Sequence, residues 1–261
     1  MTAQPSIQFA CADDVATITL NRPQKRNALN EAMWLGLAEA VRHADALPGA
    51  KIIVIRGAGG HFAAGADISE FDTVYASRER SAQYRGAVED GARAITDAAK
   101  PAIAMIEGSC VGGGMAIALA CDLRIASANA KCGITPAKLG IVYSFGDTKR
   151  LVDAVGPSKA KDILFTGRIM DATEAYAVGL VDEIHAPDAL EKAVAAKCAL
   201  LANNSQWSIR GAKEMVRFIL SGTTKENRET TDRFLDAVGQ ADFREGRTAF
   251  MEKRTPKFPY R

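Results

Sequence analysis

The sequence predicts an α/β protein in which a sheet-containing core is followed by a helical C-terminal module. Strand, loop and helix follow one another repeatedly in the first half of the chain, which is typical of a parallel-type layer of strands covered by helices. Two apolar runs, residues 51–56 and 102–107, indicate buried strands. Near residue 200 the pattern changes to amphipathic helices alone. We therefore expect a core over residues 1–200 and a helical assembly module over residues 201–261.

Turn and capping residues divide the first half into elements. Asp13-Asp14 separates two β-like runs and predicts a hairpin, and Asn30 is a suitable N-cap for a helix that Pro48-Gly49 ends. The expected elements are strands over 7–12 and 15–20, a helix over 31–47, a strand over 51–56, a helix over 77–98, a strand over 102–107, a short apolar helix over 113–120 and a strand over 123–126.

Helical periodicity dominates the second half of the chain. The expected elements are helices over 147–155, 158–165 and 173–178, a strand over 180–184, and amphipathic helices over 188–202, 205–221, 224–239 and 242–252. We find no internal repeat and no low-complexity segment.

Composition excludes several classes of protein. The 261 residues (27.8 kDa) are 48% hydrophobic and 25% charged, which argues against a disordered chain, collagen or a coiled coil. A formal charge of +2 without long runs of one sign argues against a nucleic-acid partner. No apolar run approaches the roughly 20 residues that cross a bilayer, so we expect no membrane segment.

The five cysteines indicate a reducing compartment. They are odd in number, widely spaced and without a CxxC pair, so we expect free thiols, no structural metal site and a cytoplasmic protein. The N-terminal residues also lack the basic and apolar segments of a secretory signal.

Two junctions between a loop and a helix are the candidate chemical features. Ala64-Gly65-Ala66-Asp67 follows the strand over 51–56, and Gly112-Gly113-Gly114 follows the strand over 102–107. Unpaired N–H groups at the start of a helix attract negative charge, and glycine lets a carbonyl oxygen approach the main chain. Two such donors on one oxygen would form an oxyanion hole; the alternative is a pair of tight packing turns.

Several motifs resemble, in order and spacing, the crotonase (enoyl-CoA hydratase/isomerase) superfamily over nearly the whole chain. They are Asn21–Leu29 (NRPQKRNAL), Phe62–Ile68 (FAAGADI), Gly112–Gly114 with Cys121-Asp122, Thr166–Arg168, Ala177–Val181 and the C-terminal Phe250–Phe258. The resemblance implies a crotonase-like ββα spiral core, a C-terminal helical trimerisation module that helps to cap the CoA site, and a homo-trimer or dimer of trimers. It also implies an acyl-CoA substrate and no separate cofactor, because CoA is part of the substrate.

The resemblance also assigns roles to individual positions. Ala66 and Gly113 match the two N–H donors that hold the thioester oxygen in this family. The positions implied for CoA binding are Lys25, Arg26, Ala28, Ala64, Asp67, Ile68, Lys253 and Lys257. Read from the residues alone, surface lysines and arginines are usually solvated, and Asp67 is a suitable helix cap.

The chain departs from the hydratases at the acid and the base. Those enzymes use two glutamates to add water across the double bond. Alignment from the triple glycine places the first on Ala116, and alignment from Leu139-Gly140 places the second on Pro136. Neither side chain can move a proton, so hydration by the usual pair is not expected.

Residues 135–144 instead resemble methylmalonyl-CoA decarboxylase through a Thr-Pro-x-x-Leu-Gly-x-x-Tyr pattern. The resemblance implies that Tyr143 contacts the substrate carboxylate, with Ser144 beside it. The match is partial, because that enzyme has a glutamate at the position of Ala116 and a histidine at that of Ala66. Asp147 is the nearest carboxylate to the expected acyl pocket, although it is also suited to capping or to pairing with Lys149 or Arg150.

Other classes of function remain as alternatives. A dinucleotide site is excluded because Phe62 stands where the GxGxxG fingerprint needs its last glycine. Cys110 in Gly-Ser-Cys-Val-Gly resembles a nucleophile elbow and would indicate a cysteine hydrolase, which would have to recruit His185. A specialised hydratase or isomerase with another acid, and a CoA-ester binder without turnover, are the remaining alternatives.

Overall fold

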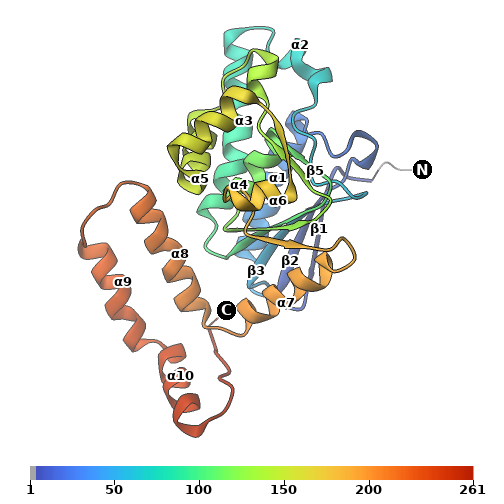
Figure 1. The fold of residues 1–261 in the computed structure, drawn as a ribbon. Coiled ribbons are helices and arrows are strands. Elements are labelled where there is room, and N and C mark those ends of the chain that lie inside the picture. The colour runs from blue at the N-terminus through green and yellow to red at the C-terminus, as the bar shows by residue number, and fades with distance from the viewer. Residues whose placement is uncertain (1–3, 261) are drawn as a thin grey trace.

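A computed structural model describes residues 4–260. Residues 1–3 of the expected core and residue 261 of the expected helical module lie outside the described part. The main sheet has the order β1-β2-β3-β4-β6-β9, with β1 and β2 antiparallel and the later neighbours parallel (Figure 1). Its strands are β1 (Ile7–Ala12), β2 (Val15–Leu20), β3 (Ile52–Gly57), β4 (Ala102–Ile106), β6 (Leu123–Ser127) and β9 (Glu183–His185).

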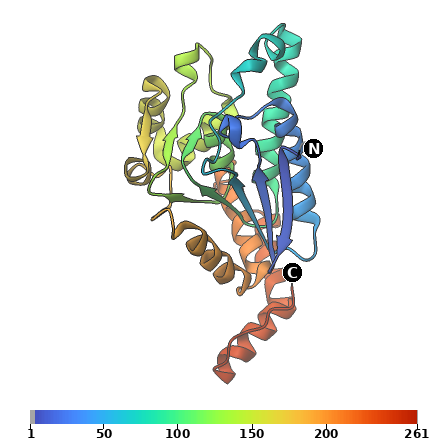
Figure 2. The same ribbon diagram turned by 90° about the vertical axis from the view of Figure 1, so that its right-hand side faces the viewer.

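The sheet is buried on both faces, which explains why its central strands are continuous apolar runs. Ile53 and Ile55 of β3 face the main core beneath α1 and α3, whereas Ile52 and Val54 pack with α7 on the opposite face. Figure 2 shows the sheet between these helices. The helices are α1 (Glu31–Ala46), α3 (Arg78–Asp97) and α7 (Leu190–Ala202).

A second, three-stranded sheet was not predicted from the sequence. It has the order β5-β7-β8, formed by β5 (Ser109–Val111), β7 (Lys131–Gly133) and β8 (Ile169–Asp171). Each strand has only three residues, which is too short for a recognisable alternation of apolar and polar side chains. This sheet places β5 immediately before α4 (Gly113–Ala120), whose bounds agree with the expected helix.

The predicted strand over 180–184 is wrong in its position. Gly179 turns with φ 85°, and the N–H groups of Leu180 and Val181 bond to the Ala175 carbonyl oxygen, so these two apolar residues close a helix. The strand begins only at Glu183. The helix in question is α6 (Ala172–Ala177).

The helices expected over 147–155 and 158–165 form α5 (Phe145–Thr166), with the predicted break at Gly156, where φ is 75°. The chain also forms α2 (Phe71–Val74) and the 3₁₀ turns η1 (Pro23–Lys25), η2 (Ile68–Glu70) and η3 (Pro136–Leu139). Among residues 4–260, no helix is long and apolar enough to cross a membrane.

The C-terminal module projects away from the sheet as a pair of antiparallel helices followed by a third (Figures 1 and 2). Its helices are α8 (Gln206–Leu220), α9 (Arg228–Gly239) and α10 (Ala241–Glu252). The predicted start of α9 at residue 224 is too early, because Asn227 caps the helix in a reciprocal capping box with Thr230. Lys213 of α8 holds the module to the core through Asp122 at 2.9 Å and the Lys100 carbonyl oxygen at 3.0 Å.

Candidate active site

The two glycine-containing loops lie against each other. Leu29 forms a parallel bridge with Ala66, and Ala63 forms another with Cys110. The main chain of Leu29 donates to Gly65 at 2.7 Å and accepts from Asp67 at 2.8 Å. The Leu29 bonds hold the loop after β3 to the segment that leads into α1, and the Ala63–Cys110 bridge brings the same loop to β5, which leads into α4.

Glycine is required for this close approach. Gly65 and Gly112 have φ values of 108° and 52°, which side-chain-bearing residues rarely adopt. A Cβ atom on Gly114 would lie 2.4 Å from the Ala63 carbonyl oxygen. A Cβ atom on Gly113 would lie 3.7 Å from the Ala66 nitrogen, so these two backbone positions are neighbours.

The N–H groups of Ala66 and Gly113 are free donors. Within residues 4–260 neither has a hydrogen-bond acceptor, whereas the nearby N–H groups of Ala64, Asp67 and Gly112 bond to main-chain oxygens. Gly113 is the first residue of α4, so its N–H has no partner within the helix. Two unpaired donors from different loops thus lie side by side.

An aromatic cluster lies beneath Gly113. The indole of Trp34 fits between two glycines, because a Cβ atom on Gly91 or Gly113 would approach it to 2.8 or 3.1 Å. The Nε1 atom of Trp34 is buried without a hydrogen-bond partner. Tyr84 is buried close by, and its burial raises its pKa to about 12. Trp34 was not singled out from the sequence, because α1 is remote from Gly113 along the chain.

Tyr143 lies next to the Gly112–Gly114 loop. Its hydroxyl donates to the Gly112 carbonyl oxygen at 3.4 Å. Burial, together with the nearby Asp147 carboxylate, raises the pKa of the Tyr143 hydroxyl well above its usual value. The tyrosine therefore stays protonated at neutral pH and is available as a donor.

Asp147 is committed to a buried network. Its carboxylate accepts from Ser144 Oγ and from Arg150 Nη2, each at 2.6 Å. Ser144 in turn caps α5 by accepting from the Asp147 N–H at 3.1 Å. Of the two expected partners, Arg150 pairs with Asp147, whereas Lys149 pairs with Asp153. With 4% of its surface exposed, Asp147 has little contact with solvent.

The two positions aligned with hydratase glutamates carry no ionisable group. Ala116 is buried in α4, and Pro136 is buried at the start of η3. The nearby acid Glu70 is occupied, because its carboxylate accepts from the Glu31 N–H at 3.0 Å at the start of α1. His61 is also occupied, because its Nδ1 atom accepts from the Ser109 N–H at 3.1 Å.

Five residues expected to bind CoA gather around the loop after β3. They are Lys25, Arg26, Ala28, Ala64 and Asp67. Asp67 caps η2 and accepts from Arg22 at 2.9 Å and Lys25 at 3.0 Å. Burial opposes ionisation of Asp67, but its bonds to Ser69, Lys25 and Arg22 prevail and hold its pKa well below the usual range. Arg22 also donates to the Ala28 carbonyl oxygen at 2.8 Å, and Ala64 bonds to Arg26.

The remaining three positions differ in their surroundings. Ile68 is 60% exposed beside Asp67, which leaves its apolar side chain open to solvent. Lys253 and Lys257 are exposed and follow the end of α10, and the Lys257 N–H donates to Glu245 of that helix. Figure 1 shows α10 in the projecting module, away from α4. The structure of one chain therefore does not bring these two lysines to the loops. Asn27, which fixes the loop through the carbonyl oxygens of Ala58 and His61, was missed in the sequence although it lies within NRPQKRNAL.

Cys110 is unsuited to nucleophilic attack. It is fully buried within β5 rather than at a turn into a helix, and burial beside Cys132 raises the pKa of its thiol well above the usual value. The thiolate is the reactive form, so the cysteine hydrolase alternative loses its nucleophile.

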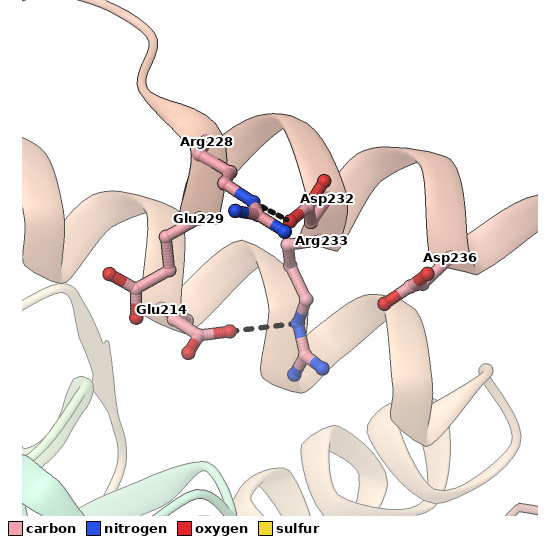
Figure 3. Close-up of a pocket in the computed structure, with 6 residues that line it drawn as sticks. All are labelled: Glu214, Arg228, Glu229, Asp232, Arg233 and Asp236. Carbon is pink, nitrogen blue, oxygen red and sulfur yellow. Dashed lines mark ion pairs between the residues drawn. The ribbon is translucent and has the colours of Figure 1, made fainter.

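Two hollows lie outside the candidate site. One of about 140 Å³ lies between the end of α3, α8 and Tyr260. Another, of about 450 Å³, lies between α8 and α9 (Figure 3). There Arg233 pairs with Glu214 at 2.7 Å and Arg228 with Asp232 at 3.4 Å, so its arginines are neutralised within the module. No group of three or more His, Cys, Asp or Glu side chains in the described part is placed to hold a metal ion.

Comparison with known proteins assigns this architecture to a family. Residues 11–261 match the enoyl-CoA hydratase/isomerase family. A probable enoyl-CoA hydratase of Rhizobium meliloti is 38% identical over 95% of both chains. A crotonyl-CoA hydratase of Syntrophomonas wolfei is 34% identical over 94% of this chain and 95% of its own. A crystal structure of a putative enoyl-CoA hydratase/isomerase family protein from Hyphomonas neptunium superposes with a TM-score of 0.96 at 45% identity over 98% of both chains.

Proposed function

The chain belongs to the enoyl-CoA hydratase/isomerase family, whose substrates are acyl-CoA thioesters, and we propose that it catalyses a lyase-type reaction, the decarboxylation of a malonyl-type CoA ester. The observation that carries this proposal is a pair of adjacent free donors, Ala66 and Gly113, in a chain that has Ala116 and Pro136 at the two positions aligned with hydratase glutamates. The donors fit stabilisation of an enolate, and the chemistry requires no protein carboxylate.

The proposed reaction balances without a cofactor other than the CoA of the substrate. The bond between the α-carbon and the carboxylate breaks, CO2 leaves, and the electron pair moves into the thioester carbonyl. The resulting enolate oxygen accepts hydrogen bonds from Ala66 and Gly113. The thioester carbonyl then re-forms as the α-carbon takes a proton from water, which gives the shortened acyl-CoA and leaves hydroxide in the solvent.

The CoA moiety would lie along the first loop. Lys25 and Arg26 carry positive charge there. Ala28 and Ala64 would contact CoA through their main-chain atoms, and the exposed Ile68 lies beside them. CoA phosphates would compete with Asp67 for Lys25, whose side chain is 45% exposed and can move. Such a shift would link CoA binding to the loop that carries Ala66.

We propose a homo-trimer or dimer of trimers as the functional unit. The module exposes large apolar side chains, which monomeric surfaces seldom gather in one region. These are Val216, Ile219, Leu220, Phe234, Leu235, Val238, Phe243, Phe250 and Met251. In such an assembly, Lys253 and Lys257 of one copy would reach the CoA site of another. Sedimentation with and without CoA would test the state of assembly.

The reaction itself is tested by mass spectrometry of an acyl-CoA panel after incubation with the protein in deuterated water. Malonyl-, methylmalonyl-, crotonyl- and 3-enoyl-CoA distinguish the reaction types. Loss of CO2 with deuterium at the α-carbon is the expected result. Binding of every ester without turnover would contradict an enzymatic role.

Hydration of an enoyl-CoA with Asp147 as the acid is the second candidate. It is favoured by relatives that are named as hydratases. It is also favoured by the closeness of Asp147 to Tyr143, whose pKa the carboxylate helps to raise. Against it, both oxygens of Asp147 already accept hydrogen bonds. Addition of water to crotonyl-CoA in the same panel would favour this candidate over decarboxylation.

A further inference from the structure

We propose that Tyr143 is a positioning residue that strengthens the Gly113 N–H donor by holding the carbonyl oxygen of the same peptide group. This inference rests on the proposed function, because it requires the Gly113 N–H to bind the thioester oxygen. The sequence comparison had instead implied contact between Tyr143 and a substrate carboxylate. The structure directs the hydroxyl to the main chain.

The peptide group between Gly112 and Gly113 has one bonded end and one free end. Its oxygen accepts from the Ala116 N–H at 3.0 Å and from the Tyr143 hydroxyl at 3.4 Å. Its N–H has no acceptor in the described residues. The φ and ψ values of Gly112, 52° and −109°, leave this group in an orientation that only glycine readily permits, so the bonds to its oxygen help to fix it.

Hydrogen bonds at the two ends of an amide reinforce each other. A donor on the oxygen withdraws electron density and makes the N–H more positive, which strengthens the bond that the N–H donates. Negative charge on the enolate oxygen would increase this polarisation. The 3.4 Å separation is long for an O–H···O bond, and catalytic hydrogen bonds often shorten only when the ligand is bound.

The single proton of the hydroxyl makes the two roles of Tyr143 exclusive. A carbonyl oxygen can only accept, so Tyr143 is the donor in this contact. While it donates to Gly112, it has no proton to donate to a substrate carboxylate. Removing the hydroxyl should therefore affect every acyl group alike, because the thioester oxygen is common to all.

The direct test is the ¹³C chemical shift of [1-¹³C]butyryl-CoA bound to the protein. Butyryl-CoA carries no carboxylate and no double bond, so only thioester polarisation is measured. We expect a downfield displacement in the wild type and a loss of roughly 10–30% of it in Tyr143→Phe. Replacing Tyr143 by 3-fluorotyrosine, a stronger donor, should move the signal further downfield. Tyr176→Phe, in an exposed tyrosine of α6, serves as the matched control.

Kinetics provide the second measurement. If Tyr143→Phe weakens one oxyanion donor by roughly 10–30%, its kcat should be roughly two- to eightfold lower. KM should change little, and the factor should be the same for every substrate that turns over. A signal that neither Tyr143 variant moves would overturn the inference while leaving the enolate mechanism intact. A defect confined to carboxylated substrates would also overturn it. Absence of any downfield displacement in the wild type would overturn the oxyanion assignment itself.

Discussion

The ammonium group of Lys25 lies 3.0 Å from a carboxylate oxygen of Asp67, the residue that follows the Ala66 donor. Arg22 reaches the same oxygen at 2.9 Å. A single buried carboxylate on the loop after β3 therefore pairs with two cations of the NRPQKRNAL motif. The position of Ala66 depends on this link, as well as on the bridge to Leu29.

Asp67→Asn should destabilise the protein by about 1–3 kcal/mol at pH 7, because two cations lose their charged partner. The folded-state pKa of Asp67 is lowered, so its contribution is present above the ordinary value of 3.8 and is lost as pH falls toward the lower folded-state value. Urea denaturation at pH 7, 5 and 3.5 should show the wild-type advantage shrinking only below about pH 4. A difference independent of pH down to 3.5 would show that the charge of Asp67 is not the source.

Gly113→Pro should lower kcat by roughly 10²–10³-fold, because it removes one proposed oxyanion donor. Proline is well tolerated at the first position of a helix, so α4 should still form. Gly113→Ala keeps the N–H and adds a Cβ atom 3.1 Å from both Leu29 and Trp34, which separates crowding from loss of the donor. Steady-state kinetics of both variants give the comparison. Full turnover by the proline variant would refute the assignment of Gly113.

The rate of decarboxylation should be nearly independent of pH between about 6 and 9. No protein carboxylate or histidine transfers a proton in the proposed reaction, and the pKa of Tyr143 is raised by burial, so its hydroxyl remains protonated over this range. A kcat profile measured with the substrate found in the acyl-CoA panel tests this. A bell-shaped profile would indicate an acid and a base and would favour hydration.

The elements that the sequence predicted correctly are those whose own residues form a continuous apolar run or a helical period. The buried strands β3 and β4 and the apolar helix α4 are recognisable from their own residues. The strands β5, β7 and β8 are not, because each has three residues and is defined only by its pairing with distant segments. In the same way, local spacing narrowed the partner of Asp147 to Lys149 or Arg150, whereas Lys25 and Asp67 are 42 residues apart and meet only in the folded chain.

Native thiol labelling should find one reactive cysteine, Cys11, because it is the exposed thiol while the other four are buried. Labelling of Cys11 should leave activity unchanged. Burial raises the pKa values of Cys121 to about 12 and of Cys198 to about 11, and that of Cys110 is also raised. Mass spectrometry after brief treatment with N-ethylmaleimide identifies the sites. Inactivation that follows modification of Cys110 would revive the hydrolase alternative.

Asp147→Asn separates the two candidate reactions. If Asp147 is structural, the variant should lose about 1–3 kcal/mol of stability, because Arg150 loses its charged partner, and should keep most of its kcat. If Asp147 is the acid of a hydratase, hydration should fall by roughly 10²–10⁴-fold with the fold intact. Asp153→Asn is the matched control, since its partner Lys149 is on the same helix and the pair is more exposed. We expect the structural result, because Asp147 is 4% exposed and its two oxygens are held by Ser144 and Arg150.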